Sequence, residues 1–247
     1  MKKIPSLVPI FLAFAGVVAL GMVTTANAES LPSRWKSSLD AFAKADKEKL
    51  PPPGGVLFVG SSTIRMWTDL SRDFRHMPVV INRGFGGSSM ADVHAFAREL
   101  VIRYKPSQVM VYAGDNDLAE GRSPEQVLDS FKLFVAGVRS ELPGTRISYI
   151  SIKPSPLRDA LLPKVREANA LIAGHIRTLP NTGYVDVFGP MLDASGKAKA
   201  ELFLPDRLHM NETGYHLWRG IIAEHLPVPE LAAANPSQPP AATLQPR

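Results

Sequence analysis

Two polar stretches of this sequence carry the side chains of a serine nucleophile and its base. Residues 60–63 read Gly-Ser-Ser-Thr and directly follow a short apolar run, so a serine would stand where a strand turns into a helix. Asp206 lies three residues before His209, just ahead of a helical pattern. An aspartate at that spacing can hold the Nδ1 proton of the imidazole, which leaves Nε2 free to accept a proton from a hydroxyl. A helix-capping serine and a surface histidine are the alternative interpretation of the two stretches.

Two further loops could bind the negative oxygen that such a reaction creates. Residues 82–89 read Asn-Arg-Gly-Phe-Gly-Gly-Ser-Ser, and the three glycines let the backbone approach a ligand. Their spacing does not match the dinucleotide-binding pattern, and a flexible turn is the alternative. Residues 114–117 read Gly-Asp-Asn-Asp, where the Asn116 amide could donate to the oxygen or simply form a turn. Asp115 and Asp117 would also suggest a metal, but no histidine or glutamate stands at ligand spacing beside them.

These stretches need a scaffold, and the apolar pattern predicts a layered one. Short apolar runs predict strands, and amphipathic runs with helical spacing separate them. The alternation indicates an α/β fold of three α/β/α layers, with a central parallel sheet covered on both faces. Ligands of such sheets bind beyond the carboxyl ends of the strands, so the loops after the strands are the functional ones. The expected strands are 55–59, 79–81, 108–112, 147–150 and 184–187. The expected helices are 90–104, 124–142, 161–176 and a last one that ends near 223. A capping box at Ser123 begins the second of these helices, and Asn211 caps the last.

The two ends of the chain differ from this folded middle. Residues 1–28 contain Lys2 and Lys3, an apolar run from 7 to 23, and an Ala-Asn-Ala site at 26–28, which together are typical of a bacterial signal peptide. An uncleaved membrane anchor is the alternative. Residues 227–247 are rich in proline and small residues, which predicts a disordered tail. We therefore expect an exported protein, periplasmic or secreted, with one folded domain at 29–226.

Composition narrows the classes of protein further. Of 247 residues, 45% are hydrophobic and 21% are charged, an ordinary globular mixture. There is no cysteine, which excludes disulfides, thiolate nucleophiles and cysteine-ligated metals. The formal net charge of +5 falls to +3 without Lys2 and Lys3, because 26 basic residues then face 23 acidic ones. So mild an excess does not indicate a nucleic-acid partner.

In their order along the chain, the four polar stretches resemble the SGNH hydrolases, also called the GDSL esterase/lipase family. The resemblance covers residues 56–218, nearly all of the expected domain. It implies a flavodoxin-like outline and ester hydrolysis that needs neither a metal nor an organic cofactor. Ser61 replaces the family's usual aspartate and is a second candidate nucleophile, but the motif position favours its neighbour. The resemblance implies Ser62 as nucleophile, His209 as base and Asp206 as its partner, with the N–H groups of Ser62 and Gly84 and the Asn116 side chain as the oxyanion hole.

The expected substrate is a small-molecule or carbohydrate ester with a short acyl group, because the loops after the strands offer few contiguous aliphatic side chains. One alternative is a lysophospholipase whose acyl chain lies along Met66, Trp67 and Phe85. Another is an envelope O-acyltransferase that uses the same serine. The non-enzymatic alternative is a carbohydrate-binding module without catalysis. We expect no membrane span after signal cleavage, and the sequence leaves the oligomeric state open.

Overall fold

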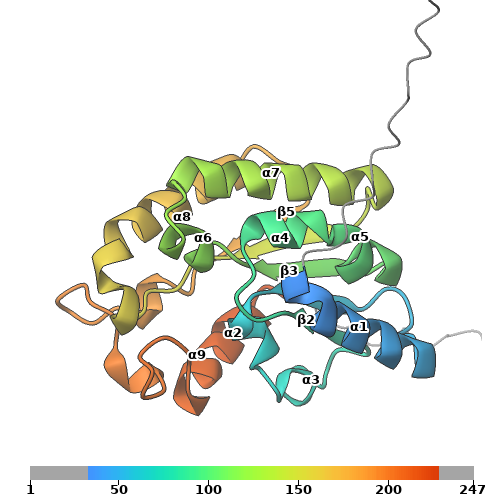
Figure 1. Ribbon diagram of the computed structural model, residues 1–247, viewed down its shortest axis with the longest axis horizontal. Coiled ribbons are helices and arrows are strands. Elements are labelled where there is room, and N and C mark those ends of the chain that lie inside the picture. The colour runs from blue at the N-terminus through green and yellow to red at the C-terminus, as the bar shows by residue number, and fades with distance from the viewer. Residues whose placement is uncertain (1–32, 228–247) are drawn as a thin grey trace, which may run out of the picture.

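Five parallel strands form the centre of the part of the chain that the structure describes. The computed structural model describes residues 33–227 (Figure 1). The strands pair in the order β2-β1-β3-β4-β5, and every neighbouring pair is parallel. The expected α/β fold with a central parallel sheet is thereby confirmed. The strands are β1 (Val56–Gly60), β2 (Val80–Gly84), β3 (Gln108–Tyr112), β4 (Arg146–Ile150) and β5 (Thr182–Val185).

Helices cover both faces of this sheet. Successive side chains of a strand point to opposite faces, so Leu57 and Val59 lie in one core cluster while Val56 and Phe58 lie in the other. In Figure 1, α7 and α8 lie above the sheet and α9 lies below it. The first cluster receives side chains from α1 (Ser33–Glu48), α4 (Met90–Ala95), α5 (Ala97–Leu100), α7 (Pro124–Glu141) and α8 (Leu162–Ile176), and the second from α2 (Ser62–Arg65), α3 (Leu70–Asp73) and α9 (Glu212–Ala223).

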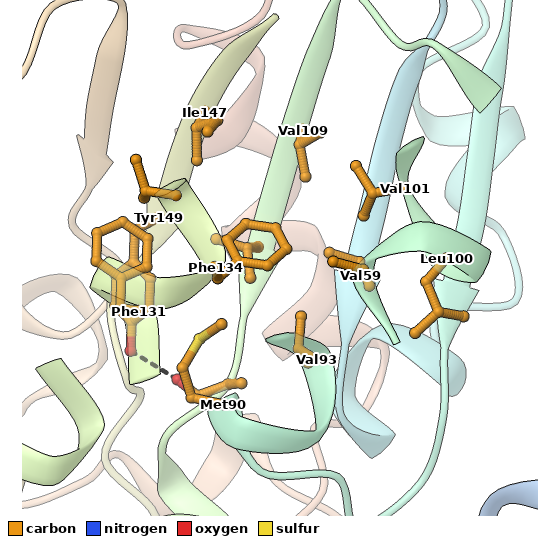
Figure 2. Packing of buried hydrophobic residues seen from close by; sticks show 14 of the residues in the cluster. Val59, Met90, Val93, Leu100, Val101, Val109, Phe131, Phe134, Ile147 and Tyr149 are labelled. Atoms are coloured by element: carbon orange, nitrogen blue, oxygen red, sulfur yellow. Dashed lines mark hydrogen bonds between the residues drawn. The ribbon is translucent and has the colours of Figure 1, made fainter. Parts of the chain in front are cut away.

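Large apolar side chains hold α7 against the sheet. Figure 2 shows Phe131 and Phe134 of α7 lying among Met90, Val109 and Tyr149. The rings of Phe131 and Tyr149 meet edge to face with centroids 5.0 Å apart. Full burial of one such side chain stabilises the fold by about 1.5–3 kcal/mol. This layer therefore provides a rigid support for the loops at the carboxyl ends of the strands.

The helix expected at 90–104 is broken into three pieces. After α4 and α5 a 3-10 turn follows at Ile102–Tyr104. Phe96 and Val101 leave helical backbone angles at the two breaks. Both side chains are buried, and aromatic and β-branched residues are weak helix formers, so packing against the sheet decides the backbone there. The apolar spacing persists across the breaks, which is why the sequence pattern predicts one helix.

The two predicted helix caps are confirmed. Ser123 Oγ accepts the Gln126 N–H at 3.3 Å, and the Gln126 side chain accepts the Ser123 N–H at 2.9 Å in return. At the start of α9, Asn211 Oδ1 accepts the Gly214 N–H at 3.1 Å. These side chains satisfy backbone donors that the first turn of a helix leaves unpaired.

Strand bounds agree with the expected ones to within three residues. The largest difference at a carboxyl end is in β2, which continues to Gly84 instead of ending at residue 81. β5 ends at Val185 because Asp186 Oδ1 accepts the N–H of Phe188 at 2.9 Å and turns the chain. The remaining short elements are α6 (Asp115–Ala119) and 3-10 turns at Pro156–Leu161, Gly189–Met191 and Ala200–Leu202.

The predicted signal peptide (1–28) lies outside the described residues, as do the first four residues of the expected domain (29–32) and all but the first residue of the expected tail (228–247). Within residues 33–227, no helix combines the length and the apolarity that crossing a bilayer requires.

Candidate active site

Ser62 stands at the start of α2, directly beyond the carboxyl end of β1. Gly60 ends the strand at a φ of +145°, and a Cβ there would lie 1.8 Å from the Tyr112 carbonyl oxygen, so only glycine permits this turn beside β3. Ser61 follows in an extended conformation, and its carbonyl accepts the N–H groups of Ile64 and Arg65, both at 3.1 Å. The Ser62 N–H therefore heads a helix, where backbone donors favour negative charge.

The structure brings Ser62, His209 and Asp206 together, although 147 positions separate the serine from the histidine. His209 Nε2 lies 2.9 Å from Ser62 Oγ. His209 Nδ1 lies 2.6 Å from Asp206 Oδ2. The line of contacts runs from hydroxyl to imidazole to carboxylate, which is the geometry that removes a proton from a serine.

The carboxylate of Asp206 is kept ionised by its hydrogen bonds. The His209 side chain donates to one oxygen, and the N–H groups of Leu208 and His209 donate to the other, both at 2.9 Å. These donors lower the pKa of Asp206 to about 2, although the side chain is 46% exposed. Asp206 therefore carries its negative charge at every pH at which the imidazole can act as a base.

A tight loop holds this aspartate and histidine in register. The Leu204 N–H donates to the His209 carbonyl and the Arg207 N–H donates to the Leu204 carbonyl, both at 2.8 Å. Arg207 takes a left-handed φ of +61°, which turns the chain between Asp206 and His209. Asn211 then caps α9 and fastens the end of the loop to the helix.

Ser61 has a different environment from Ser62. Its side chain is fully buried, and Ser61 Oγ has no hydrogen-bond partner within residues 33–227. The imidazole of His209 contacts Ser62, and Ser62 lines the adjoining pocket whereas Ser61 does not. The geometry thus favours Ser62 as the reactive serine and leaves the replacement at position 61 as a small buried hydroxyl.

Asn116 lines the same pocket, and two contacts fix the orientation of its amide. Arg158 Nη2 donates to Asn116 Oδ1 at 2.9 Å, and Asn116 Nδ2 donates to the Ser88 carbonyl at 3.0 Å. A guanidinium can only donate and a carbonyl can only accept, so these partners identify the oxygen and the nitrogen of the amide. One N–H of the Asn116 side chain remains available to a ligand. The sequence pattern did not identify Arg158 as part of the site.

A buried charged cluster lies behind Asn116. Arg158 Nη1 is 3.2 Å and Lys153 Nζ is 3.7 Å from the same oxygen of Asp115, and the Tyr112 hydroxyl donates to that oxygen at 3.3 Å. Burial lowers the pKa of Lys153, and the Asp115 carboxylate opposes that shift. Arg158, which stays charged, thus has the Asp115 carboxylate as its ion-pair partner behind Asn116.

The two aspartates beside Asn116 serve the protein itself. Asp115 pairs with the cations described above, and Asp117 Oδ2 accepts the Met90 N–H at 2.8 Å. Burial raises the pKa of Asp117 to about 6. Among residues 33–227, no three His, Cys, Asp or Glu side chains are grouped closely enough to hold a metal ion.

Gly84, whose N–H is expected to bind the oxyanion, already has an acceptor for that N–H within the protein. Its N–H donates to the Asn82 side chain at 2.9 Å, so this donor is already used inside β2 and its following turn. Gly86 and Gly87 line the pocket instead, together with Ser62 and Asn116. The N–H of Gly87 has no acceptor within the described part of the chain, whereas its carbonyl accepts a hydrogen bond from Arg34 at 2.9 Å. The N–H groups of Gly86 and Gly87 are therefore the backbone donors of this loop that have no acceptor within residues 33–227.

The pocket over Ser62 is open and has a volume of about 460 Å³. One wall comes from α1, a helix that the sequence pattern did not predict, through Arg34, Trp35 and Ser38. Trp35 packs edge to face on Phe85 with ring centroids 5.2 Å apart, which anchors this wall to the loop of Gly86 and Gly87. Helix α1 thus completes the site from outside the four sequence motifs.

The acyl groove considered along Met66, Trp67 and Phe85 is not present. Phe85 is fully buried and Trp67 is only 2% exposed, so both rings belong to the core. Met66 and the edge of Trp67 line a separate hollow of about 410 Å³ beside α9, and neither Ser62 nor His209 lines it. A long acyl chain therefore finds no contiguous apolar surface among these three residues.

Comparisons with known proteins give the family and the fold of this chain. A model of the GDSL-like Lipase/Acylhydrolase family matches residues 58–217, more than half of the chain. Among curated proteins, none matches the sequence. Solved structures show the same fold at low sequence identity. A GDSL-like lipase from Bacteroides thetaiotaomicron is 22% identical with a TM-score of 0.66, and the match covers 76% of this chain and 96% of that chain. An acetyl-xylooligosaccharide esterase from Geobacillus Stearmophilus is 15% identical with a TM-score of 0.57, and the match covers 70% of this chain and 94% of that chain. The Clostridium thermocellum family 3 carbohydrate esterase is 16% identical with a TM-score of 0.56, and the match covers 68% of this chain and 92% of that chain.

Proposed function

Because this chain belongs to the GDSL-like lipase/acylhydrolase family and is a hydrolase of ester bonds, we propose that it cleaves its substrates through an acyl-enzyme on Ser62. The observation that carries the proposal is the continuous line of contacts from Ser62 Oγ through His209 to Asp206, with distances of 2.9 and 2.6 Å. The three side chains can carry out the reaction from the positions that they already occupy.

The proposed reaction has two halves. His209 Nε2 takes the Ser62 proton as Oγ attacks the ester carbonyl, and the same proton passes to the alcohol oxygen when the bond between carbonyl carbon and alcohol oxygen breaks. Water then attacks the acyl-enzyme, gives its proton to His209, and the acid leaves as Ser62 regains its hydrogen. Asp206 stays ionised and stabilises the imidazolium in both halves.

Three donors bind the oxyanion of each tetrahedral intermediate. They are the N–H groups of Ser62 and Gly87 and the free side-chain N–H of Asn116. Arg158 and the Ser88 carbonyl position Asn116, so this amide needs no reorientation when charge develops. Arg158 is thus a positioning residue, because it acts through Asn116 and does not line the pocket.

We propose short acyl groups, acetyl to about butyryl, on a small-molecule or carbohydrate alcohol. The pocket beside Ser62 is lined by glycine, serine, asparagine and arginine, with Leu208 and the largely buried Trp35 as its apolar members. Each buried methylene contributes only about 0.8 kcal/mol, so a long chain needs a long apolar groove. Two structures of the same fold are named as an acetyl-xylooligosaccharide esterase and a carbohydrate esterase, which supports this choice.

The acyl-enzyme is tested by mass spectrometry after rapid acid quenching of the protein with p-nitrophenyl acetate. The expected adduct is one acetyl group on Ser62, present in the wild type, absent in Ser62→Ala and present in Ser61→Ala as the matched control. An acetyl group on Ser61, or ester hydrolysis without any adduct and with full activity of Ser62→Ala, overturns the proposal. Product analysis with an added sugar acceptor separates hydrolysis from acyl transfer.

Export is a second part of the proposal and rests on residues 1–28 alone. Their positive start, apolar run and Ala-Asn-Ala site support cleavage before Glu29. Expression of the full chain in a bacterium, followed by N-terminal analysis of the periplasmic and medium fractions, tests it. A mature chain beginning at Glu29 is expected, and an uncut chain in the membrane fraction contradicts it.

A further inference from the structure

The pocket over Ser62 contains positive charge that the proposed reaction does not use. Arg34 of α1 and Arg65 of α2 reach the loop of Gly86 and Gly87 from two different helices. Arg34 Nη2 donates to the Gly87 carbonyl at 2.9 Å. The guanidinium of Arg65 lies over Gly86, where a Cβ would stand 2.9 Å from Arg65 Nε. Gly86 therefore leaves the space that lets Arg65 lie beside the oxyanion loop.

These two guanidinium groups are not equally neutralised. Arg34 has Glu120 at 3.5 Å, with both side chains about half exposed. No carboxylate of residues 33–227 lies within ion-pairing distance of Arg65, whose side chain is exposed. No aspartate or glutamate of the described chain lines the pocket itself. Arg65 is thus a full positive charge that faces the substrate without a partner.

Two basic side chains also lie behind the pocket. Arg158 and Lys153 share one carboxylate, Asp115, beneath Asn116. The nearest catalytic carboxylate, Asp206, is held by the His209 side chain and two backbone N–H groups. Asp206 stays ionised, so the positive charge at the pocket is that of its lining residues Arg34 and Arg65, and a site lined by one sign of charge raises the local concentration of the opposite sign.

We infer that the substrate is an ester whose alcohol part carries an anionic group, a carboxylate or a phosphate, and that Arg65 determines this specificity by binding that group. The inference rests on the proposed function and adds the chemical class of the alcohol. The anion is assigned to the alcohol because the proposed acyl group is short and Arg65 lines the pocket with an exposed side chain. Acidic sugars that bear acyl esters have this chemistry.

The decisive test compares aryl acetates of different charge, with each kcat/KM divided by the rate constant of alkaline hydrolysis of the same ester, because the leaving phenols differ in acidity. Methyl 4-acetoxybenzoate is neutral, 4-acetoxybenzoate carries a carboxylate, and 4-acetoxyphenyl phosphate carries a phosphate. The readout is the ratio of kcat/KM for each anion to kcat/KM for the methyl ester. The two anionic arms separate a preference for carboxylate from one for phosphate. Salt should lower the ratio, because an exposed ion pair is screened.

Three variants assign the preference to a residue. Arg65→Gln should lower the ratio by about 1.5- to 5-fold, the range for one exposed ion pair, and Arg65→Glu should lower it further. Arg98→Gln is the matched control, since Arg98 is an exposed arginine that pairs with Glu141 away from the pocket. Arg34 is less suitable because it also holds the Gly87 carbonyl.

The outcomes separate this inference from the proposed function. A ratio above one in the wild type that falls in both Arg65 variants, but not in Arg98→Gln, supports it. Cleavage of all three esters with a ratio near one, or a ratio that Arg65→Glu leaves intact, overturns the inference and leaves Ser62 catalysis in place. Failure of the wild type to cleave any of them overturns the proposed function as well. O-acetylated polygalacturonate and O-acetylated xylan then serve as the anionic and neutral polymers, and equal deacetylation of both also contradicts the inference.

Discussion

Replacing Arg158 should slow the chemical step although this residue does not line the pocket. Its Nη2 donates at 2.9 Å to Asn116 Oδ1, and its side chain is 19% exposed, so solvent screens the contact only weakly. A hydrogen bond to a charged group contributes about 1.5–3 kcal/mol. If Arg158→Gln loses that orientation in the transition state, kcat falls about 10- to 10²-fold, because about 1.4 kcal/mol corresponds to one factor of ten.

Two features of the structure bound this estimate. Arg158 acts through Asn116, so its loss cannot exceed the roughly 10²- to 10³-fold effect of removing an oxyanion donor. KM should change little, because Asn116 touches the oxygen that becomes negative and Arg158 is behind it. Arg158→Lys keeps the positive charge, but a single ammonium lacks the forked donors that reach both Asn116 and Asp115. Compared with Arg158→Gln, Arg158→Lys should therefore recover more of the thermal stability than of kcat.

The assay is a double-mutant cycle with a short-acyl ester as substrate. Measurements of kcat and KM on Arg158→Gln, Asn116→Ala and the double variant show whether the two effects are independent. We expect Arg158→Gln to change kcat by less than about twofold once Asn116 is alanine, the sign of strong coupling. Arg166→Gln is the matched control, because Arg166 donates to the Gly196 carbonyl and lies over the Phe188 ring, and it does not line the pocket.

Thermal unfolding of each variant separates catalysis from folding. Arg158 also pairs with Asp115, so its loss leaves that buried carboxylate with Lys153 alone and should lower Tm. The reasoning is refuted if Arg158→Gln keeps wild-type kcat. The reasoning is also refuted if the double variant loses kcat by the product of the two single losses, since the arginine would then act without the amide.

Four further outcomes follow from the structure. Ser62→Ala should lose on the order of 10⁴-fold or more in kcat, whereas Ser61→Ala should keep most activity because that hydroxyl is buried and faces no imidazole. Asn116→Ala should lower kcat by about 10²- to 10³-fold with little change in KM; near-normal kcat means that the amide only shapes a turn. Burial raises the pKa of Asp117 from 3.8 to about 6, so its contribution to stability is complete below about pH 4 and is lost as the pH rises to about 6. The free energy of unfolding, measured with urea, should therefore fall by about 3 kcal/mol over that range. Asp117→Asn should abolish this fall. Turnover of p-nitrophenyl acetate and butyrate should exceed that of octanoate and palmitate, and a steady rise toward palmitate contradicts the short-acyl proposal.

The layered fold could be predicted from the sequence because its signals are local. Short apolar runs such as 108–112 and amphipathic runs such as 161–176 bury their apolar sides whatever their neighbours are, and the observed β3 and α8 match them closely. The caps at Ser123 and Asn211 are equally local, since each side chain satisfies an N–H three residues away. The three-residue spacing of Asp206 and His209 within one loop is likewise a local signal.

Helix α1 shows a signal that was present but not decisive. Its apolar residues Trp35, Leu39 and Phe42 have helical spacing, yet the segment between them is strongly polar. Only the packing of Trp35 on Phe85 makes the helix a wall of the pocket. The helix matters because of where it docks, and a local pattern does not contain that information.

The sequence by itself determined which chemical groups exist, and the local spacing that places them on turns after strands. Tertiary structure alone decided which groups meet. The Asn82 side chain takes the Gly84 N–H while Gly86 and Gly87 line the pocket, a difference that depends on backbone direction and not on residue type. Arg158 reaches Asn116 across 42 positions, and Arg65 lies over Gly86, only because the sheet brings separate loops to one edge. Hydrogen-bond direction and side-chain proximity depend on distances in space, and those are set by packing of the whole domain.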